Sequence, residues 1–198
     1  MNKKVLYISY NGLLEPILPS QAIPYLKILS KNGYRFILLT FEKTKDLKKI
    51  GKKGLKNIEN GLEKDGIIWK HLRYHKYPDK ISTFLDIAIG FFVSLYLLVK
   101  HKADIIHVRG ATPGVITLFL PKSIKSKVLF DTRGLLAEEY AGGGLWKEGG
   151  LFFNIVKAAE KMLLKRDIFF FICQKTRKWP ATPIFWKKIV NIRSLACY

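Results

Sequence analysis

The sequence has few of the residues that build metal sites and disulfide frameworks. It contains two cysteines, Cys173 and Cys197, which lie far apart, and four histidines that do not cluster with them. Zinc sites and disulfide-stapled folds need closely spaced Cys or Cys/His pairs. We therefore expect no bound metal and no disulfide framework. The scarcity of cysteine favours a reducing, cytoplasmic environment.

The sequence also lacks a dinucleotide-binding fingerprint. The first strand pattern, Val5–Tyr10, continues into Asn11 and Gly12 without a Gly-x-Gly-x-x-Gly motif. That motif lets the backbone approach the pyrophosphate of a dinucleotide. We therefore expect neither NAD nor FAD, and no other cofactor. This strand pattern directly follows Lys3 and Lys4, is too short for the apolar core of a signal peptide and has no cleavage site, so we expect no signal peptide.

Acidic residues are scarce. Fifteen Asp and Glu stand against 35 Lys and Arg, which gives a formal net charge of +20, and only seven of the basic residues are arginine. Nucleic-acid readers favour arginine for bidentate contacts, so this composition predicts no nucleic-acid partner. A lysine excess suits an anionic membrane surface or merely keeps a protein soluble. A non-enzymatic basic module that binds anionic membrane or nucleic acid stays open as the alternative function.

The hydrophobic periodicity predicts one α/β domain over residues 1–198, without internal repeats or a linker. Strand patterns alternate with helix patterns, and such units pair their strands in parallel. We expect a Rossmann-like parallel sheet flanked by helices. The expected strands are Val5–Tyr10, Arg35–Phe41, Ile67–Tyr74, Asp104–Val108, Lys127–Asp131, Asp167–Ile172 and Lys188–Ile192. The expected helices run from an N-cap at Ser20 to about Lys31, from about Leu151 to Lys165 and over part of Lys175–Lys188, and a short helix or turn is expected around Pro113–Leu120.

Two further segments leave alternatives open. Lys43–Lys64 carries eight lysines against three acids, which predicts a solvated helix or loop, with a basic landing surface as the functional alternative. Ile81–Val99 is the most apolar segment and approaches the length of a membrane span. Because it contains Asp86 and precedes a strand pattern, we expect a core helix packed on the sheet. A membrane-facing hydrophobic face and a true membrane span are the alternatives.

Polar residues follow two neighbouring strands of the expected sheet. Arg109 ends one strand, and Asp131, Arg133 and Gly134 end the next. Ligands of open α/β sheets bind outside the carboxyl edge. We predict that Arg109 and Arg133 open onto a solvent-reachable cleft for an anionic or hydroxyl-rich ligand, unless Asp131 and Arg133 form a structural pair. His107 is interpreted as a core residue, with catalysis as the less favoured reading.

Other candidate site residues lie in the adjoining loops. Glu138 and Glu139, in the turn expected after the Asp131 strand, could accept hydrogen bonds from acceptor hydroxyls or act as a base. The alternative is a pair of surface acids near a helix start. At the exit of the first strand, Asn11, Gly12 and Gln21 are candidate substrate-binding residues, since Gly12 permits a tight turn close to a ligand.

Six short motifs stand in an order that is typical of one protein family. They are Tyr-Ile-Ser-Tyr-Asn11-Gly12, Ser20-Gln21 with Pro24-Tyr25-Leu26, Thr40-Phe41-Glu42, Ile106-His107-Val108-Arg109, Phe130-Asp131-Thr132-Arg133-Gly134 with Glu138-Glu139, and Ala159-Glu160-Lys161. In this order they resemble the N-terminal, acceptor-side domain of family 4 glycosyltransferases, which have the GT-B fold. The likeness covers nearly the whole chain.

The resemblance implies a retaining glycosyltransferase that moves a hexosyl group from a nucleotide-diphosphate sugar to a glycan or lipid-linked acceptor. It is compatible with peripheral contact at the inner face of the cell membrane. Many relatives place His-Gly where Arg133 and Gly134 stand here, so Arg133 is expected to steady charge. Family members continue into a second, donor-binding domain with paired glutamates. We expect that domain to be absent from this chain, and the chain to be inactive alone.

Overall fold

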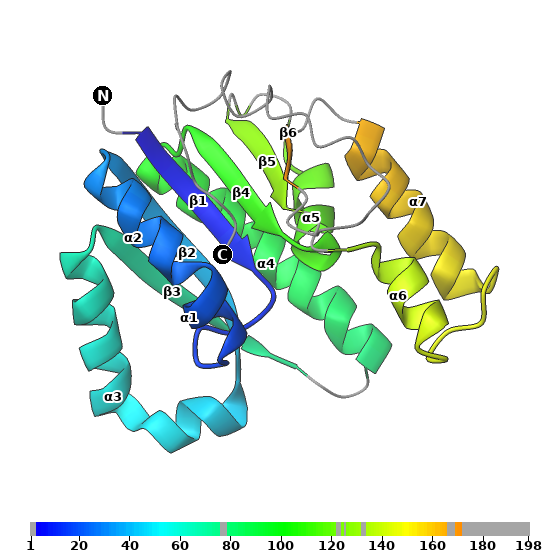
Figure 1. Ribbon diagram of the computed structural model, residues 1–198, viewed down its shortest axis with the longest axis horizontal. Helices are drawn as coiled ribbons and strands as arrows, with labels where there is room; N and C mark the ends of the chain where they lie inside the picture. Colours follow the sequence, from blue (N-terminus) through cyan, green and yellow to red (C-terminus); the bar gives the residue numbers. More distant parts are fainter. Residues whose placement is uncertain are drawn as a thin grey trace.

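A six-stranded parallel β-sheet organises the computed structural model, which describes residues 3–75, 79–121, 124, 126–131, 134–165 and 169–171. The strand order is β3-β2-β1-β4-β5-β6 (Figure 1). The strands are β1 (Lys3–Ser9), β2 (Tyr34–Lys43), β3 (Ile67–Tyr74), β4 (Ile105–Arg109), β5 (Lys127–Asp131) and β6 (Phe169–Phe171). The predicted Rossmann-like α/β fold is confirmed.

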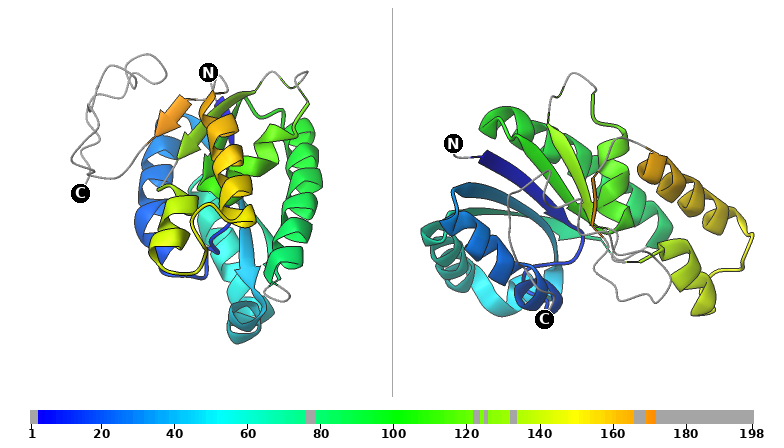
Figure 2. Two further views of the ribbon diagram at one scale, coloured as in Figure 1. Left: turned by 90° about the vertical axis from the view of Figure 1, so that its right-hand side faces the viewer. Right: turned by 45° about the horizontal axis from the view of Figure 1, so that its top comes forward.

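Helices cover both faces of the sheet. On one side lie α1 (Ile17–Gln21), α2 (Ile23–Lys31) and α3 (Thr44–Lys64), and on the other lie α4 (Asp79–His101), α5 (Ala111–Leu118) and α7 (Leu151–Lys165). The left view in Figure 2 shows α2 and α4 on opposite sides of the strands. The short helix α6 (Leu136–Gly142) packs against α7.

The side chains of the central strands explain this layering. Successive residues of a strand point to opposite faces, so β1 contributes Tyr7 to the core under α1–α3 and Leu6 and Ile8 to the core under α4, α5 and α7. All three are fully buried. Strands that are covered on both faces read as continuous apolar runs, which is the pattern that predicted them.

The helix after β1 differs from the prediction. Ser20 does not cap a helix, because it lies inside α1 and its hydroxyl donates to the carbonyls of Pro16 and Ile17, at 2.8 and 3.1 Å. The chain then departs from ideal helix geometry at Ala22 (φ −108°), and α2 begins at the next residue. The prediction of a single helix from Ser20 is therefore wrong, because a short helix already precedes it.

The lysine-rich segment forms the predicted solvated helix. Among the residues of α3, all of which are described, Leu62 alone is buried, and Gly51 (φ 65°, ψ 172°) interrupts the helical geometry. The strand expected at Asp167–Ile172 is described as Phe169–Phe171. The helix and strand expected over Lys175–Lys188 and Lys188–Ile192 lie outside the described residues.

Candidate functional site

The sheet order creates a switch point between β1 and β4. From β1 the chain winds outward to β2 and β3, and from β4 it winds the other way. Parallel pairing places Ser9 opposite Arg109, and Arg109 opposite Asp131, so the ends of β1, β4 and β5 share one row. Ligands of doubly wound sheets bind outside the carboxyl edge at such a point. The structure thus places Arg109 and Asp131 side by side in this row.

Arg109 is held inside the protein. Its side chain is only 6% exposed, and its Nη2 donates to Oε1 of Gln21 at the end of α1. The prediction that the Arg109 guanidinium opens onto solvent is therefore wrong, because α1 covers it. The same contact joins two of the predicted substrate-binding residues. Asp131 is 2% exposed beside Arg109.

A ring cluster lies behind Arg109. Tyr25 donates its hydroxyl to that of Tyr7 at 2.9 Å, and the His107 ring meets the Tyr7 ring edge-on, with centroids 4.5 Å apart. Burial, together with the nearby Arg109 charge, lowers the pKa of His107 to about 3. Burial also raises the pKa of Tyr7, which Arg109 opposes. His107 therefore stays neutral, and its interpretation as a core residue is confirmed.

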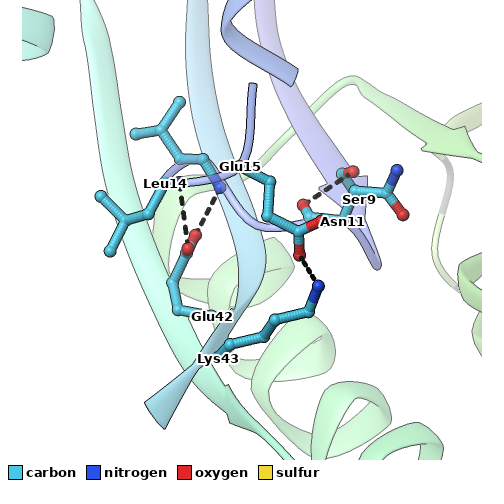
Figure 3. A network of polar contacts seen from close by, with 7 residues as sticks. Ser9, Asn11, Leu14, Glu15, Glu42 and Lys43 are labelled. Atoms are coloured by element: carbon cyan, nitrogen blue, oxygen red, sulfur yellow. Dashed lines mark hydrogen bonds and ion pairs between the residues drawn. The ribbon is translucent and has the colours of Figure 1, made fainter. Parts of the chain in front are cut away.

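The loop after β1 is shaped by Glu42, a fully buried carboxylate near the end of β2. It accepts the backbone N–H groups of Leu13 and Leu14 at 2.6 and 3.1 Å (Figure 3). It also accepts the hydroxyl of Thr40 at 2.5 Å. A Cβ on Gly12 would lie 2.4 Å from a Glu42 oxygen. The carboxylate therefore fixes the close turn predicted at Gly12.

Asn11 lies at the outer side of this loop. Its side chain is exposed, and its carbonyl accepts the hydroxyl of Ser9 at 3.1 Å. An ion pair between Glu15 and Lys43 at 3.2 Å joins the same loop to the end of β2 (Figure 3). The loop that carries Asn11 and Gly12 is thus tied to the sheet at several points. This leaves Asn11 in a defined place at the carboxyl edge.

Glu138 and Glu139 lie in the first turn of α6, as the alternative of a pair of acids near a helix start predicts. Glu138 pairs with Lys157 of α7 at 2.8 Å, and this hydrogen bond lowers the pKa of Glu138. A carboxylate with a lowered pKa is a weaker base. Glu139 lies against Gly134, where an added Cβ would clash with its carboxylate. The catalytic roles predicted for both acids stay predictions.

The start of α6 depends on a residue of the last resemblance motif. Glu160 of α7 is 5% exposed, and its Oε1 accepts the backbone N–H of Leu136 at 2.7 Å. It therefore caps α6 from a neighbouring helix. Burial raises the pKa of Glu160. Arg133, the remaining predicted catalytic residue, lies outside the described residues.

Sequence reasoning missed a second polar group at the same edge. The buried carboxylate of Asp86 on α4 accepts the Tyr10 hydroxyl at 2.9 Å, and its other oxygen lies 2.6 Å from Nδ1 of His75. Tyr10 follows β1, and His75 follows β3. The one sequence sign of this group was an isolated aspartate in an apolar segment. Its partners are far away in sequence and could not be inferred.

The described residues offer no group of three or more His, Cys, Asp or Glu side chains that could hold a metal ion. They do form an open recess of about 280 Å³ between the end of α4 and the starts of β4 and β5, lined in part by Leu98, Lys102 and Asp104. This recess lies at the amino edge of the sheet. It is therefore separate from the row formed by Ser9, Arg109 and Asp131.

The sheet order and the polar residues at the carboxyl ends of β1, β4 and β5 define a Rossmann-like α/β domain. Its polar groups gather at the switch point between β1 and β4. No family model and no curated protein matches the chain. Among solved structures, a glycosyltransferase from Rickettsia africae ESF-5 is 16% identical, with a TM-score of 0.44 over 71% of this chain and 34% of that chain. Glycyrrhiza uralensis UGT73P12, in complex with glycyrrhetinic acid 3-O-monoglucuronide, is 8% identical, with a TM-score of 0.44 over 71% of this chain and 30% of that chain.

A third solved structure is a proposed UDP-N-acetylglucosamine 2-epimerase from Listeria monocytogenes. It is 16% identical, with a TM-score of 0.44 over 87% of this chain and 45% of that chain. The chain therefore spans less than half of each of these three proteins. At such identities and TM-scores the likeness assigns neither a family nor an activity to this chain.

Proposed function

We propose that this chain is the acceptor-binding half of a retaining glycosyltransferase with the GT-B fold. In this proposal a second Rossmann-like domain holds the nucleotide-diphosphate sugar, and a hexosyl group passes to a glycan or lipid-linked acceptor. The described residues form one Rossmann-like unit. Enzymes of this kind gain rate by closing two domains on the reactants, so the 198 residues alone are expected to transfer no sugar.

One observation carries the proposal, namely the contact between Arg109 and Gln21 at the switch point. A buried arginine that binds the amide oxygen of Gln21 fixes the orientation of that amide. Fixed amides and carboxylates are suited to sugar hydroxyls, which both donate and accept hydrogen bonds. Gln21 is exposed, so a ligand can reach it from outside. Asn11 provides a second exposed amide at the same edge.

The buried environment of Arg109 also supports the proposal. In a water-poor environment a fixed cation stabilises negative charge more strongly than in solvent. Arg109 lies in such an environment, beside Asp131. In the proposal the buried Arg109 keeps the Gln21 amide in a fixed orientation, while the row of polar strand ends aligns the acceptor. The motif order in the sequence supports the same assignment.

Binding of acceptor-type sugars by the purified chain tests the proposal. The probes are immobilised oligosaccharides and detergent-dispersed lipid-linked sugars. We expect one class of sugar to be retained, and Gln21→Ala to weaken its binding about tenfold through the loss of one hydrogen bond. Ser20→Ala is the matched control, because the Ser20 hydroxyl is already committed to carbonyls of its own helix.

Two results would overturn the proposal. One is the absence of binding to every sugar probe. The other is tight binding to RNA or DNA with a steep salt dependence that Gln21→Ala leaves unchanged. That second result would establish the basic binding module as the better account of the +20 charge.

A further inference from the structure

Helix α4 has an unusual distribution of side chains. Its large apolar residues face outward, with Phe84 71% exposed and Phe92 67% exposed. The exposed apolar residues of α4 are Phe84, Leu85, Ile89, Phe92, Tyr96 and Val99. From Leu85 onward they recur at steps of three and four residues, which places them in one stripe along the helix. We call these six residues the apolar stripe.

The buried side of the same helix carries polar residues. Asp86 and Ser94 are fully buried, and Ser82 is 2% exposed. Asp86 is satisfied by Tyr10 and His75, as described above. The inner side of α4 also carries core residues such as Leu97 and Leu98, so the helix is apolar on its outer face as well as on its inner one. Helices at the surface of soluble proteins present polar residues outward. An exposed apolar surface of this extent marks a site of interaction.

The ends of the stripe indicate the chemistry of the partner. Lys100 donates to the Tyr96 hydroxyl at 3.0 Å, and its ammonium lies 5.2 Å from the centre of that ring. Lys4 lies near the same end of the helix, because its backbone N–H donates to the Asp104 carboxylate, just after α4, at 2.8 Å. Burial, followed by Lys100, Lys4 and Lys70, lowers the pKa of His101. The stripe therefore ends in a cluster of lysines. The same combination of apolar and basic residues is found on helices that lie in the interface of an anionic bilayer.

The helix is long enough to cross a membrane, but its packing opposes this. Ser82–His101 is the one segment among the described residues that has the length and hydropathy of a span, and a third of it is buried in the protein. Leu97 and Leu98 belong to the core shared with Leu6 and Ile8 of β1. Crossing would pull these side chains out of that core. The helix can therefore bind lipid only along its outer face.

We propose that the apolar stripe of α4 docks the protein on the surface of an anionic lipid bilayer. The stripe lies at the boundary of the acyl chains, and Lys100 reaches the phosphate groups of the lipids. A second copy of this chain is disfavoured as the occupant, because two molecules with a net charge of +20 repel each other.

Flotation of the full 198-residue chain with lipid vesicles tests this inference. The vesicles contain phosphatidylcholine alone or phosphatidylcholine mixed with phosphatidylglycerol. We expect binding to the anionic vesicles only, and a loss of about tenfold in partitioning for each of Phe84→Ser and Phe92→Ser. Ile28→Ser is the matched control, since Ile28 is 47% exposed on α2, on the other side of the sheet. It is expected to bind as the unmodified chain does.

The outcomes separate lipid from other occupants. Unchanged binding of the Phe84→Ser/Phe92→Ser variant would overturn the inference, because the charge alone would then hold the protein on the vesicles. So would an oligomer, seen by size-exclusion chromatography, that this variant dissociates while no vesicle binding occurs. Circular dichroism checks that the variant is folded, which its exposed positions favour. The inference does not depend on the proposed sugar transfer, so either can fail alone.

Discussion

Among individual positions, Gly12 shows how the absence of a side chain shapes the carboxyl edge. An added Cβ would meet the Glu42 carboxylate at 2.4 Å and the carbonyl of Phe41 at 3.1 Å. The carboxylate cannot move aside easily, because it accepts the N–H groups of Leu13 and Leu14. The loop that presents Asn11 therefore depends on glycine at this position.

Replacing Gly12 should consequently destabilise the protein. We expect Gly12→Ala to lower the free energy of unfolding by about 1–3 kcal/mol, the usual cost of overpacking. Gly61→Ala is the matched control, because Gly61 lies in α3 with no atom within 4 Å of an added Cβ. That change should raise stability by roughly 0.5–1 kcal/mol, as alanine does in helices. Urea denaturation measures both, and equal effects would contradict the account.

The buried imidazole of His107 gives a prediction about pH. Its folded pKa of about 3 lies below the unfolded value near 6.5, so the unfolded chain takes up the proton first. Its contribution to stability is thus complete above pH 6.5 and falls as the pH drops toward 3. When the pH is lowered from 7 to 5, protonation of this imidazole in the unfolded chain should reduce the free energy of unfolding by about 2 kcal/mol.

Comparison with His107→Phe isolates this effect, since phenylalanine keeps a ring against Tyr7 and has no proton to bind. Denaturant unfolding at pH 7 and pH 5 should show the unmodified protein losing about 2 kcal/mol more than the variant. NMR titration of the ring provides a second measurement. A titration midpoint near 6.5 would show that the imidazole is not buried as described.

Arg109 shows what sequence could not provide at this scale. Its place at the end of a strand followed from a short apolar run that stops at a charge. Its exposure did not, because Gln21, which covers it, lies 88 positions away in the chain. Glu42 was noted only within a motif, although it organises the loop after β1. Local periodicity indicates neither the direction of a side chain at a strand end nor the residues that cover it.

Some helices and strands follow directly from the sequence pattern, whereas others depend on tertiary contacts. The bounds of β3, β5 and α7 agree with the predicted ranges, since a strongly apolar or amphipathic run ends at charged or glycine residues. No bounds were predicted for helix α6, whose start near Glu138 and Glu139 was only an alternative. It is seven residues long and has Glu138 and Glu139 in its first turn, which leaves no apolar repeat to detect. Its capping by Glu160, on another helix, is a tertiary contact.

Helix α4 is joined to the ends of two strands by Asp86, and this supports a prediction about stability. Asp86→Ala should lower the free energy of unfolding by roughly 3 kcal/mol, because it leaves the Tyr10 hydroxyl and the His75 N–H without their acceptor. Tyr10→Phe removes one of these bonds and should cost about 1.5 kcal/mol.

Tyr96→Phe is the control on the same helix. The Tyr96 hydroxyl only accepts from Lys100 at the surface, so its loss should change stability by less than about 0.5 kcal/mol. Thermal and urea unfolding of the three variants measure the loss of stability in each, which we expect to be largest for Asp86→Ala and smallest for Tyr96→Phe. A larger effect for Tyr96→Phe than for Asp86→Ala would show that Asp86 does not join α4 to the strands.

Across the whole molecule, we assign separate binding roles to two surfaces, the carboxyl edge of the sheet and the outer face of α4. The carboxyl edge gathers Asn11, Gln21 and Arg109 at the switch point, where we propose that an acceptor sugar binds. The outer face of α4 presents the apolar stripe to lipid. Alternation of strands and helices in the sequence was enough to predict the parallel sheet. The sequence left the direction of the stripe open, because an apolar segment has the same pattern whether it faces a core or a membrane.

Chemical-shift mapping of the isotope-labelled chain tests the central claim most directly. The ligand is the sugar probe that the binding screen retains. The account predicts that the largest shifts occur at the backbone amides of Asn11 and Gly110 and at the side-chain amide of Gln21. Shifts confined to the lysine-rich α3, with these three amides unchanged, would contradict it.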